Sequence, residues 1–238
     1  MSTVEHSAPV LAIDGPSGTG KGTIAGRVAD HLGWHTLDSG ALYRAIAYVA
    51  VENGITPDDT LELEKLTRTI AVEFVHTADG LDILVDGLDI TDHIRSEAGG
   101  RRASIYAKSP VVREGLLSRQ RQLRTPPGLV ADGRDMGTVV FPDAFLKVFL
   151  DASASVRAQR RYNQLKAKGF DVKLRALERE IADRDAQDRS RPVSPLVPAG
   201  DAIVLDTSQK GIGQVFAEVT KLVEDRLASG QRSSNTGG

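Results

Sequence analysis

Short apolar runs alternate with helix-length segments along most of the chain. The apolar runs span residues 9–13, 128–132, 146–151 and 202–206, and residues 35–40 are a weaker candidate for a fifth. Runs of this length that are apolar at successive positions are typical of buried parallel strands. The segments between them show helical periodicity and have glycine near their ends. The alternation predicts a doubly wound α/β protein with a parallel sheet.

Residues 70–92 break this pattern. Apolar residues alternate with polar ones there, and two Asp-Gly pairs, at 79–80 and 86–87, interrupt the alternation. This combination indicates short antiparallel strands joined by tight turns. We expect residues 65–105 to form a small insert domain, and a decorated edge of the main sheet is the alternative.

The two ends of the chain differ in composition from the region between them. Residues 1–8 are polar, and residues 229–238 are mostly Gly, Ser and other small or polar residues. Such segments bury too little apolar surface to fold, so we expect two disordered tails around a core of residues 9–64 and 106–228. The first residues show neither the basic nor the apolar region of a signal peptide, and a cytoplasmic location is therefore expected.

Composition and charge exclude several classes of function. Thirty basic and 32 acidic side chains leave a net charge of −2, which gives no general attraction to nucleic acid. The absence of cysteine excludes disulfides, thiol nucleophiles and thiolate metal sites. The five histidines show no metal-ligand spacing, and no apolar run approaches the ~18 residues of a membrane helix. We therefore expect no protein metal site and neither nucleic acid nor a membrane as a partner.

The stretch IDGPSGTGKGT, residues 13–23, follows the first apolar run. Its G-x-x-x-x-G-K pattern surrounds an anion with backbone N–H groups and a helix N-terminus, and it places Lys21 at the β- and γ-phosphates of a nucleotide. Most such loops have Ser or Thr directly after the lysine as a Mg²⁺ ligand, whereas this chain has Gly22. Thr23 comes about 100° further round the helix. Mg²⁺ is therefore expected to be held mainly by nucleotide phosphates and water.

Arginines gather in two places outside the loop. The first group is Arg157, Arg160 and Arg161, and the second is Arg184 and Arg191 with Asp188. The spacings of four and three residues in the second group predict a single helical face. Phosphoryl transfer to an acceptor that is already a phosphate needs positioning and charge neutralisation rather than a strong base. The arginines favour such a kinase, and ion pairs on a solvated helix surface are the alternative.

Two further stretches carry charges where strands are expected to end. In LDSGALYR, residues 37–44, Arg44 could turn back towards an anion. In ADGRDMGTVVFP, residues 131–142, Asp132 ends an apolar run, where a carboxylate close to Mg²⁺ or its waters is expected. Arg134 and Asp135 are adjacent opposite charges that a plain turn would not need, although a local ion pair would also explain them.

These stretches, together with KVFLDAS, RDAQDRSRPVSPLVPA and DAIVLDTS, resemble the bacterial cytidylate kinase family, whose members phosphorylate CMP and dCMP. The resemblance runs from about residue 9 to 225, and DGRDMGTVVFPDA is its most specific part. It implies a three-layer α/β/α P-loop fold with a five-stranded parallel sheet, a CMP-side insert domain and a mobile helical lid near residues 157–170. It also implies transfer of the γ-phosphoryl group of ATP to CMP or dCMP, and a monomer.

The resemblance further implies roles for single residues. Catalysis would involve Lys21, Asp132, Arg134, Arg160 and Arg191. The ATP site would comprise Arg157 and the loop, which is Gly15, Pro16, Ser17, Gly18, Thr19, Gly20, Lys21, Gly22 and Thr23. The CMP contacts would be Ser39, Arg44 and Arg134 at the phosphate, Arg191 at the phosphoryl region, Ser104, Arg113 and Asp135 at cytosine, and Arg184 and Asp188 at the ribose. A carboxylate such as that of Asp135 accepts from the exocyclic amine of cytosine, whereas UMP would present a carbonyl to it.

Two alternatives to this function remain open. The acceptor could instead be UMP, AMP or a non-nucleotide such as shikimate. The protein could also be a nucleotide-dependent switch or a nucleic-acid-associated ATPase that hydrolyses ATP without an acceptor. The neutral charge balance and the absence of an N-K-x-D guanine motif disfavour this second alternative.

Overall fold

A computed structural model describes residues 8–77, 80–167 and 169–235. Contacts between Cα atoms divide the chain into two compact units: residues 38–122 form one, and the segments before and after them form the other. Each unit is described by itself. Apart from Ala8, which is buried, the tail expected at residues 1–8 lies outside the described residues.

The discontinuous unit is built on the five-stranded parallel sheet that the sequence predicted. Its strands are β1 (Val10–Asp14), β2 (His35–Asp38), β6 (Leu129–Gly133), β7 (Leu146–Asp151) and β8 (Ile203–Asp206). They lie in the order β2-β6-β1-β7-β8. The central strand β1 pairs in parallel with β6 and β7, and β7 pairs in parallel with β8. All five expected strands are confirmed, and their carboxyl ends share one edge of the sheet. The expected burial does not hold for β8, because it is an edge strand and most of its side chains are exposed.

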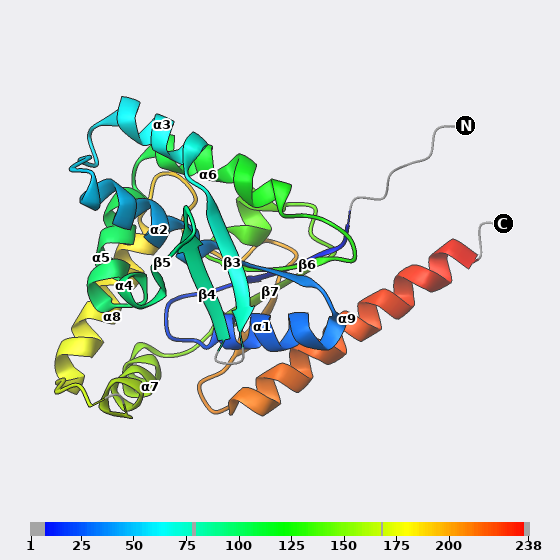
Figure 1. Ribbon diagram of the computed structural model, residues 1–238. Helices are drawn as coiled ribbons and strands as arrows, with labels where there is room; N and C mark the ends of the chain where they lie inside the picture. Colours follow the sequence, from blue (N-terminus) through cyan, green and yellow to red (C-terminus); the bar gives the residue numbers. More distant parts are fainter. Residues whose placement is uncertain (1–7, 78–79, 168, 236–238) are drawn as a thin grey trace, which may run out of the picture. The chain divides into compact units, whose positions relative to one another are not determined.

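Two helices cover one face of this sheet. Helix α1 (Lys21–Leu32) and helix α9 (Ile212–Asn235) pack side by side (Figure 1). Their apolar side chains join those of β1, β6 and β7 in one buried cluster, which includes Ile24, Val28 and Val219. Because this core fixes the start of α1 against the end of β1, it also fixes the loop that connects them.

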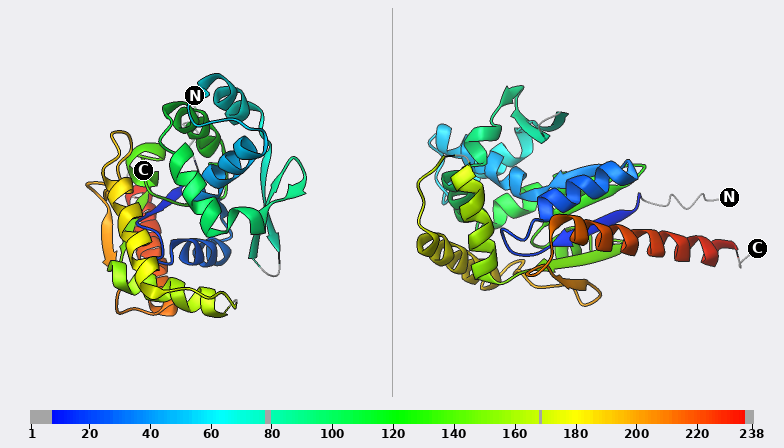
Figure 2. Two further views of the ribbon diagram at one scale, coloured as in Figure 1. Left: turned by 90° about the vertical axis from the view of Figure 1, so that its left-hand side faces the viewer. Right: turned by 90° about the horizontal axis from the view of Figure 1, so that it is seen from below.

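Two more helices of this unit, α7 (Ala154–Ala167) and α8 (Leu174–Arg189), pack against each other (Figure 2). They enclose a small apolar cluster of their own, formed by Ala158, Leu165, Leu177 and Ile181. The expected lid at about residues 157–170 falls mainly on α7, and its movement stays a prediction.

The unit of residues 38–122 combines helices with a small antiparallel sheet. The helices are α2 (Ser39–Glu52), α3 (Thr60–Thr69), α4 (Thr91–Ile94), α5 (Glu97–Tyr106) and α6 (Pro110–Gln122). The strands are β3 (Val72–Thr77), β4 (Gly80–Val85) and β5 (Leu88–Asp89), in that order. The turn between β4 and β5 is the second Asp-Gly pair, with φ of 49° at Asp86 and 80° at Gly87. Part of the first pair lies outside the described residues.

This unit includes more residues than the predicted insert of residues 65–105, because α2 packs on α5 and α3 packs on α6. Which of its residues form a functional CMP-side domain stays a prediction.

The carboxyl-terminal segment differs from the prediction of a disordered tail. Helix α9 continues to Asn235, and only residues 236–238 lie outside the described part of the chain. Extending an existing helix fixes one residue for each hydrogen bond gained, so polar residues can continue a helix that they would not nucleate.

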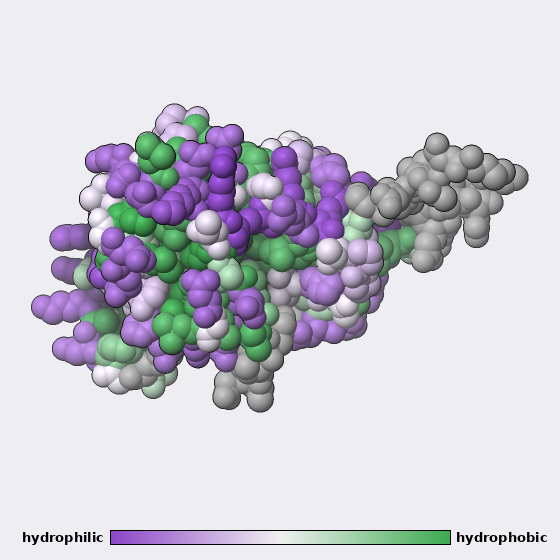
Figure 3. Space-filling view, turned by 45° about the horizontal axis from the view of Figure 1, so that its top comes forward, coloured by the Kyte–Doolittle hydropathy of each residue, from purple (hydrophilic) through white to green (hydrophobic). Residues whose placement is uncertain are grey.

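On the face shown in Figure 3, hydrophilic and hydrophobic side chains are intermixed. None of the described helices is both long enough and apolar enough to cross a membrane.

Candidate active site

The loop between β1 and α1 depends on glycines with positive φ. Gly15, Gly18 and Gly20 have φ of 145°, 81° and 92°, which side chains disfavour. A Cβ atom at Gly15 would lie 2.0 Å from the carbonyl oxygen of Leu150 in β7. The loop therefore passes directly over the edge of the sheet and leads into the N-terminus of α1, an arrangement that suits an anion.

We expect Gly15→Ala to lower the free energy of unfolding by about 3 kcal/mol, since the new methyl group adds backbone strain and a clash with β7. Gly26→Ala is the matched control. Gly26 lies inside α1, where a Cβ atom would meet no heavy atom of the described residues within 4 Å. That change should stabilise the protein by roughly 0.5–1 kcal/mol. Urea unfolding measures both, and a Gly15→Ala protein as stable as the wild type would contradict the prediction.

Lys21, the first residue of α1, is buried, and its Nζ donates to the carbonyl oxygen of Pro16 at 2.9 Å. The hydroxyl of Thr19 donates to the same carbonyl at 3.1 Å. Burial lowers the pKa of Lys21 to about 7, and the charge of Arg134 acts in the same direction. An anion on the loop would favour the charged form of the lysine.

Asp132 lies in β6 beside Ile13 of β1 and is 8% exposed. A Cβ atom at Gly22 would lie 3.5 Å from Oδ2 of Asp132. The carboxylate therefore faces the position that carries Ser or Thr in most such loops. Thr23 is exposed on α1.

Asp14, the last residue of β1, is a site residue that sequence reasoning missed. Its Oδ1 accepts from the N–H of Met136 and its Oδ2 from the N–H of Gly137, each at 2.8 Å. Burial raises the pKa of Asp14 to about 6, although the two N–H groups oppose the shift. The carboxylate anchors the π-helix η1 (Met136–Val140), which directly follows Arg134 and Asp135. Such helices often mark functional sites. The only signal for Asp14 in the sequence is its place directly before the loop.

A buried carboxylate joins two of the predicted arginines. Asp188 on α8 accepts from Nε of Arg134 at 3.1 Å through Oδ2, and it pairs with Arg191 through Oδ1. The prediction that Arg184, Asp188 and Arg191 share one helical face is wrong, because α8 ends at Arg189. Pro192 disfavours helical geometry in the residue before it. Arg191 nevertheless turns back to Asp188 from beyond the helix.

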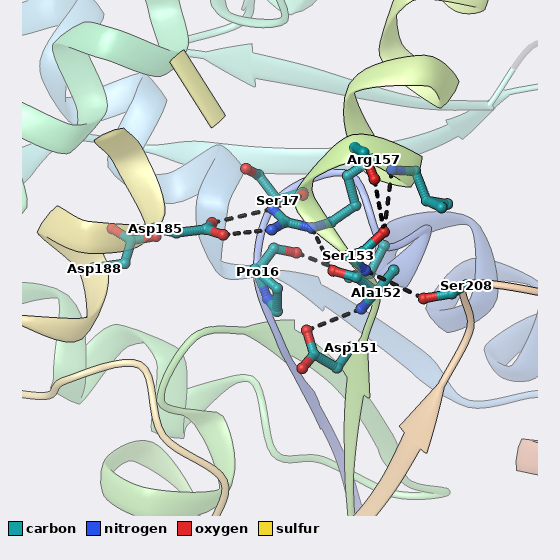
Figure 4. Close-up of polar contacts among 12 residues, drawn as sticks. Pro16, Ser17, Asp151, Ala152, Ser153, Arg157, Asp185, Asp188 and Ser208 are labelled. Atoms are coloured by element: carbon teal, nitrogen blue, oxygen red, sulfur yellow. Dashed lines mark hydrogen bonds and ion pairs between the residues drawn. The ribbon is translucent and has the colours of Figure 1, made fainter. Parts of the chain in front are cut away.

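Two arginines of α7 contact loop backbone: Arg157, which was predicted at the ATP site, and Arg160, which was predicted to take part in catalysis. Arg157 donates to the carbonyl oxygen of Ser17 at 3.0 Å and forms an ion pair with Asp185 (Figure 4). Arg160 donates to the carbonyl oxygen of Thr19 at 3.4 Å and to the hydroxyl of Thr207 at 3.2 Å. Arg161, in contrast, bonds to Gln164 of its own helix.

The remaining predicted residues belong to the unit of residues 38–122. Ser39 and Arg44 lie on α2, and Ser104 lies on α5, which packs on α2. The guanidinium group of Arg113 on α6 lies 5.6 Å from the ring centroid of Tyr43, also on α2. The structure thus brings these four residues onto neighbouring helices of one unit.

A parallel sheet with a glycine-rich, lysine-bearing loop at the carboxyl end of its central strand defines a P-loop protein. A family model described as cytidylate kinase matches residues 11–225, and the chain belongs to this family. It is 50% identical over 228 residues to a cytidylate kinase of Shewanella putrefaciens, covering 95% of this chain and 99% of that one. It is 51% identical over 227 residues to one of Shewanella denitrificans, covering 94% and 100%. Among solved structures, a gluconokinase of Sinorhizobium meliloti matches with a TM-score of 0.43 and 14% identity, over 92% of this chain and 97% of that one.

Proposed function

We propose that this protein transfers the γ-phosphoryl group of ATP to CMP or dCMP, giving ADP and CDP or dCDP. The observation that carries the proposal is the family match over residues 11–225, together with 50% sequence identity to a cytidylate kinase over 95% of this chain. The geometry of the loop and of the arginines supports it.

The loop would bind the β- and γ-phosphates of ATP through its N–H groups and the N-terminus of α1. Lys21, now bonded to Pro16, would turn to the phosphates and neutralise charge on the transferred group. Arg160, which lies against the loop at Thr19, would assist it. The phosphate of CMP is already largely anionic near neutral pH, so no strong base is needed to activate it.

Mg²⁺ fits this site through oxygen ligands and water. The carboxylate of Asp132 faces Gly22, where there is no side chain, which leaves room for bound water beside an acidic oxygen. Mg²⁺ prefers oxygen ligands and keeps several waters. Asp132 would hold the ion through such waters, and the ion would supply charge neutralisation at the β- and γ-phosphates.

The acceptor would be bound by the residues that were predicted to contact CMP. Its phosphate would contact Ser39, Arg44, Arg134 and Arg191. A guanidinium group has five N–H donors, so Arg134 and Arg191 can bind phosphate oxygens while they remain close to Asp188. Cytosine would contact Ser104, Arg113 and Asp135, and the ribose would contact Arg184 and Asp188.

An acceptor panel tests this function. The protein, ATP and Mg²⁺ are mixed with CMP, dCMP, UMP, AMP, GMP or no acceptor, and ADP formation is followed. Turnover that is fast only with CMP and dCMP is expected. Turnover led by UMP or AMP would leave a kinase with another acceptor, and equal ADP formation without acceptor would indicate an ATPase.

The lowered pKa of Lys21 predicts how pH affects ATP binding. With a pKa of about 7 in the free protein, Lys21 is largely neutral at pH 8, and the phosphates would restore its charge on binding. ATP binding should therefore take up a proton, and affinity should fall by up to about tenfold per pH unit above 7. Calorimetry in buffers of different ionisation enthalpy measures how many protons are taken up when ATP binds. Lys21→Arg should abolish the uptake because arginine does not titrate in this range, and a wild type that takes up no proton at pH 8 would contradict the prediction.

A further inference from the structure

We propose that Asp185 is a positioning residue for the phosphate loop and that it acts through Arg157. This inference rests on the proposed binding of ATP by the loop. It assigns to Arg157 an indirect role, in place of direct contact with ATP.

Asp185 and Arg157 form a buried ion pair between α8 and α7. Asp185 is 4% exposed and Arg157 is 2% exposed. Oδ1 of Asp185 accepts from one terminal nitrogen of the guanidinium group at 3.1 Å, and Oδ2 pairs with the other (Figure 4). Two parallel bonds of this kind fix the orientation of the guanidinium plane as well as its position.

The rest of the guanidinium group contacts backbone. Its Nε donates to the carbonyl oxygen of Ala152, which directly follows β7, at 2.9 Å. The terminal nitrogen that faces Oδ1 also donates to the carbonyl oxygen of Ser17 at 3.0 Å. These bonds engage at least four of the five N–H donors of arginine. Arg157 is therefore held by β7 and α8 while it holds the loop.

The contact with Ser17 determines how the next peptide group is oriented. In a planar trans peptide the C=O and N–H bonds point in opposite directions. When the carbonyl of Ser17 points at Arg157, the N–H of Gly18 must point to the other side of the loop. The contact is close, because a Cβ atom at Gly18 would lie 3.1 Å from Cβ of Arg157. Asp185 thus helps to present the N–H of Gly18 to an anion.

A purely structural role for the pair of Asp185 and Arg157 predicts another result than a positioning role. If the pair only joined α7 to α8, its loss would lower the stability of the protein and leave its affinity for ATP unchanged. If it positions the loop, its loss weakens ATP binding while the KM for CMP stays nearly constant.

The experiment measures ATP binding by calorimetry without any acceptor, followed by the KM for ATP and for CMP. Asp185→Asn should weaken ATP binding by about 10- to 100-fold, as expected for misoriented binding groups, with the KM for CMP within about twofold. The control is Asp183→Asn, because Asp183 is an exposed aspartate on the same helix. This change should leave the ATP affinity and the KM for CMP unchanged. Asp185→Asn with wild-type ATP affinity would overturn the inference.

A second design does not depend on a stable Asp185→Asn protein. The double variant Arg157→Met with Asp185→Leu replaces both charged residues by apolar ones, so that neither charge is left buried without its partner. Such exchanges of buried ion pairs often preserve stability. Arg157→Lys keeps the charge but lacks the fork that reaches Asp185 and Ser17 at once. Both proteins should fold and bind ATP weakly, and wild-type affinity in the double variant would refute the inference. A wild-type protein that binds no ATP would instead refute the proposed function.

Discussion

Lys21→Ala is expected to lower kcat with ATP and CMP by about 100- to 1,000-fold, the range found when one preorganised charge-stabilising group is lost. The lysine is buried at the start of α1 and points at the backbone of the loop, so its ammonium group is held close to where the β- and γ-phosphates are proposed to lie. Charge that develops on the transferred group would lose its nearest side-chain donor. Initial rates over a grid of ATP and CMP concentrations give kcat and both KM values.

Lys221→Ala provides the control, because Lys221 is an exposed lysine of α9. It should leave kcat and both KM values unchanged. Turnover by Lys21→Ala at the wild-type rate would contradict the phosphoryl-transfer mechanism, whatever the acceptor.

Asp135→Ala is expected to lower kcat/KM for CMP by about 10- to 100-fold and to affect UMP much less. Asp135 is 5% exposed and directly precedes η1, so a base amine that lost this acceptor would be left buried and unpaired. Leaving a buried donor without its partner costs roughly 1–3 kcal/mol. UMP presents a carbonyl at the same place and gains nothing from the carboxylate.

Asp135→Asn sharpens the test because it keeps the size of the side chain. Its amide nitrogen can donate to the carbonyl of UMP, so the ratio of kcat/KM for CMP to that for UMP should move towards UMP. Circular dichroism verifies that each variant is folded. Equal losses for CMP and UMP in both variants would show that Asp135 does not recognise the base.

Local patterns predicted the sheet and the loop because each depends on residues close together in the chain. The four apolar runs and the weaker candidate at residues 35–40 became the five strands, and the lysine-bearing loop lies where its spacing placed it. The end of α8 was missed because helical spacing was extended past Pro192. That error had a local cause and was avoidable.

Contacts between distant segments could not be predicted in the same way. Asp14 bonds to residues 122 and 123 positions further on, and no periodicity reports such a partner. The family resemblance implied that Arg157 contacts ATP, but its burial and its bonds to Asp185 and Ser17 appear only once α7 and α8 are packed. Charged residues reveal that a phosphate site exists, whereas their individual partners depend on tertiary packing.

The carboxylate of Asp188, which pairs with both Arg134 and Arg191, sets the net charge that this group would offer at the proposed acceptor site. The two guanidinium groups and Asp188 together carry one net positive charge, since one carboxylate already offsets one of them. An anion bound by these arginines would share their N–H donors with Asp188, which is tethered in place and costs no entropy to bring there. A phosphate monoester brings two negative charges to this net positive charge, whereas cytidine brings none. We therefore expect a phosphate monoester to bind at these arginines much more tightly than an unphosphorylated nucleoside or a monovalent anion such as chloride.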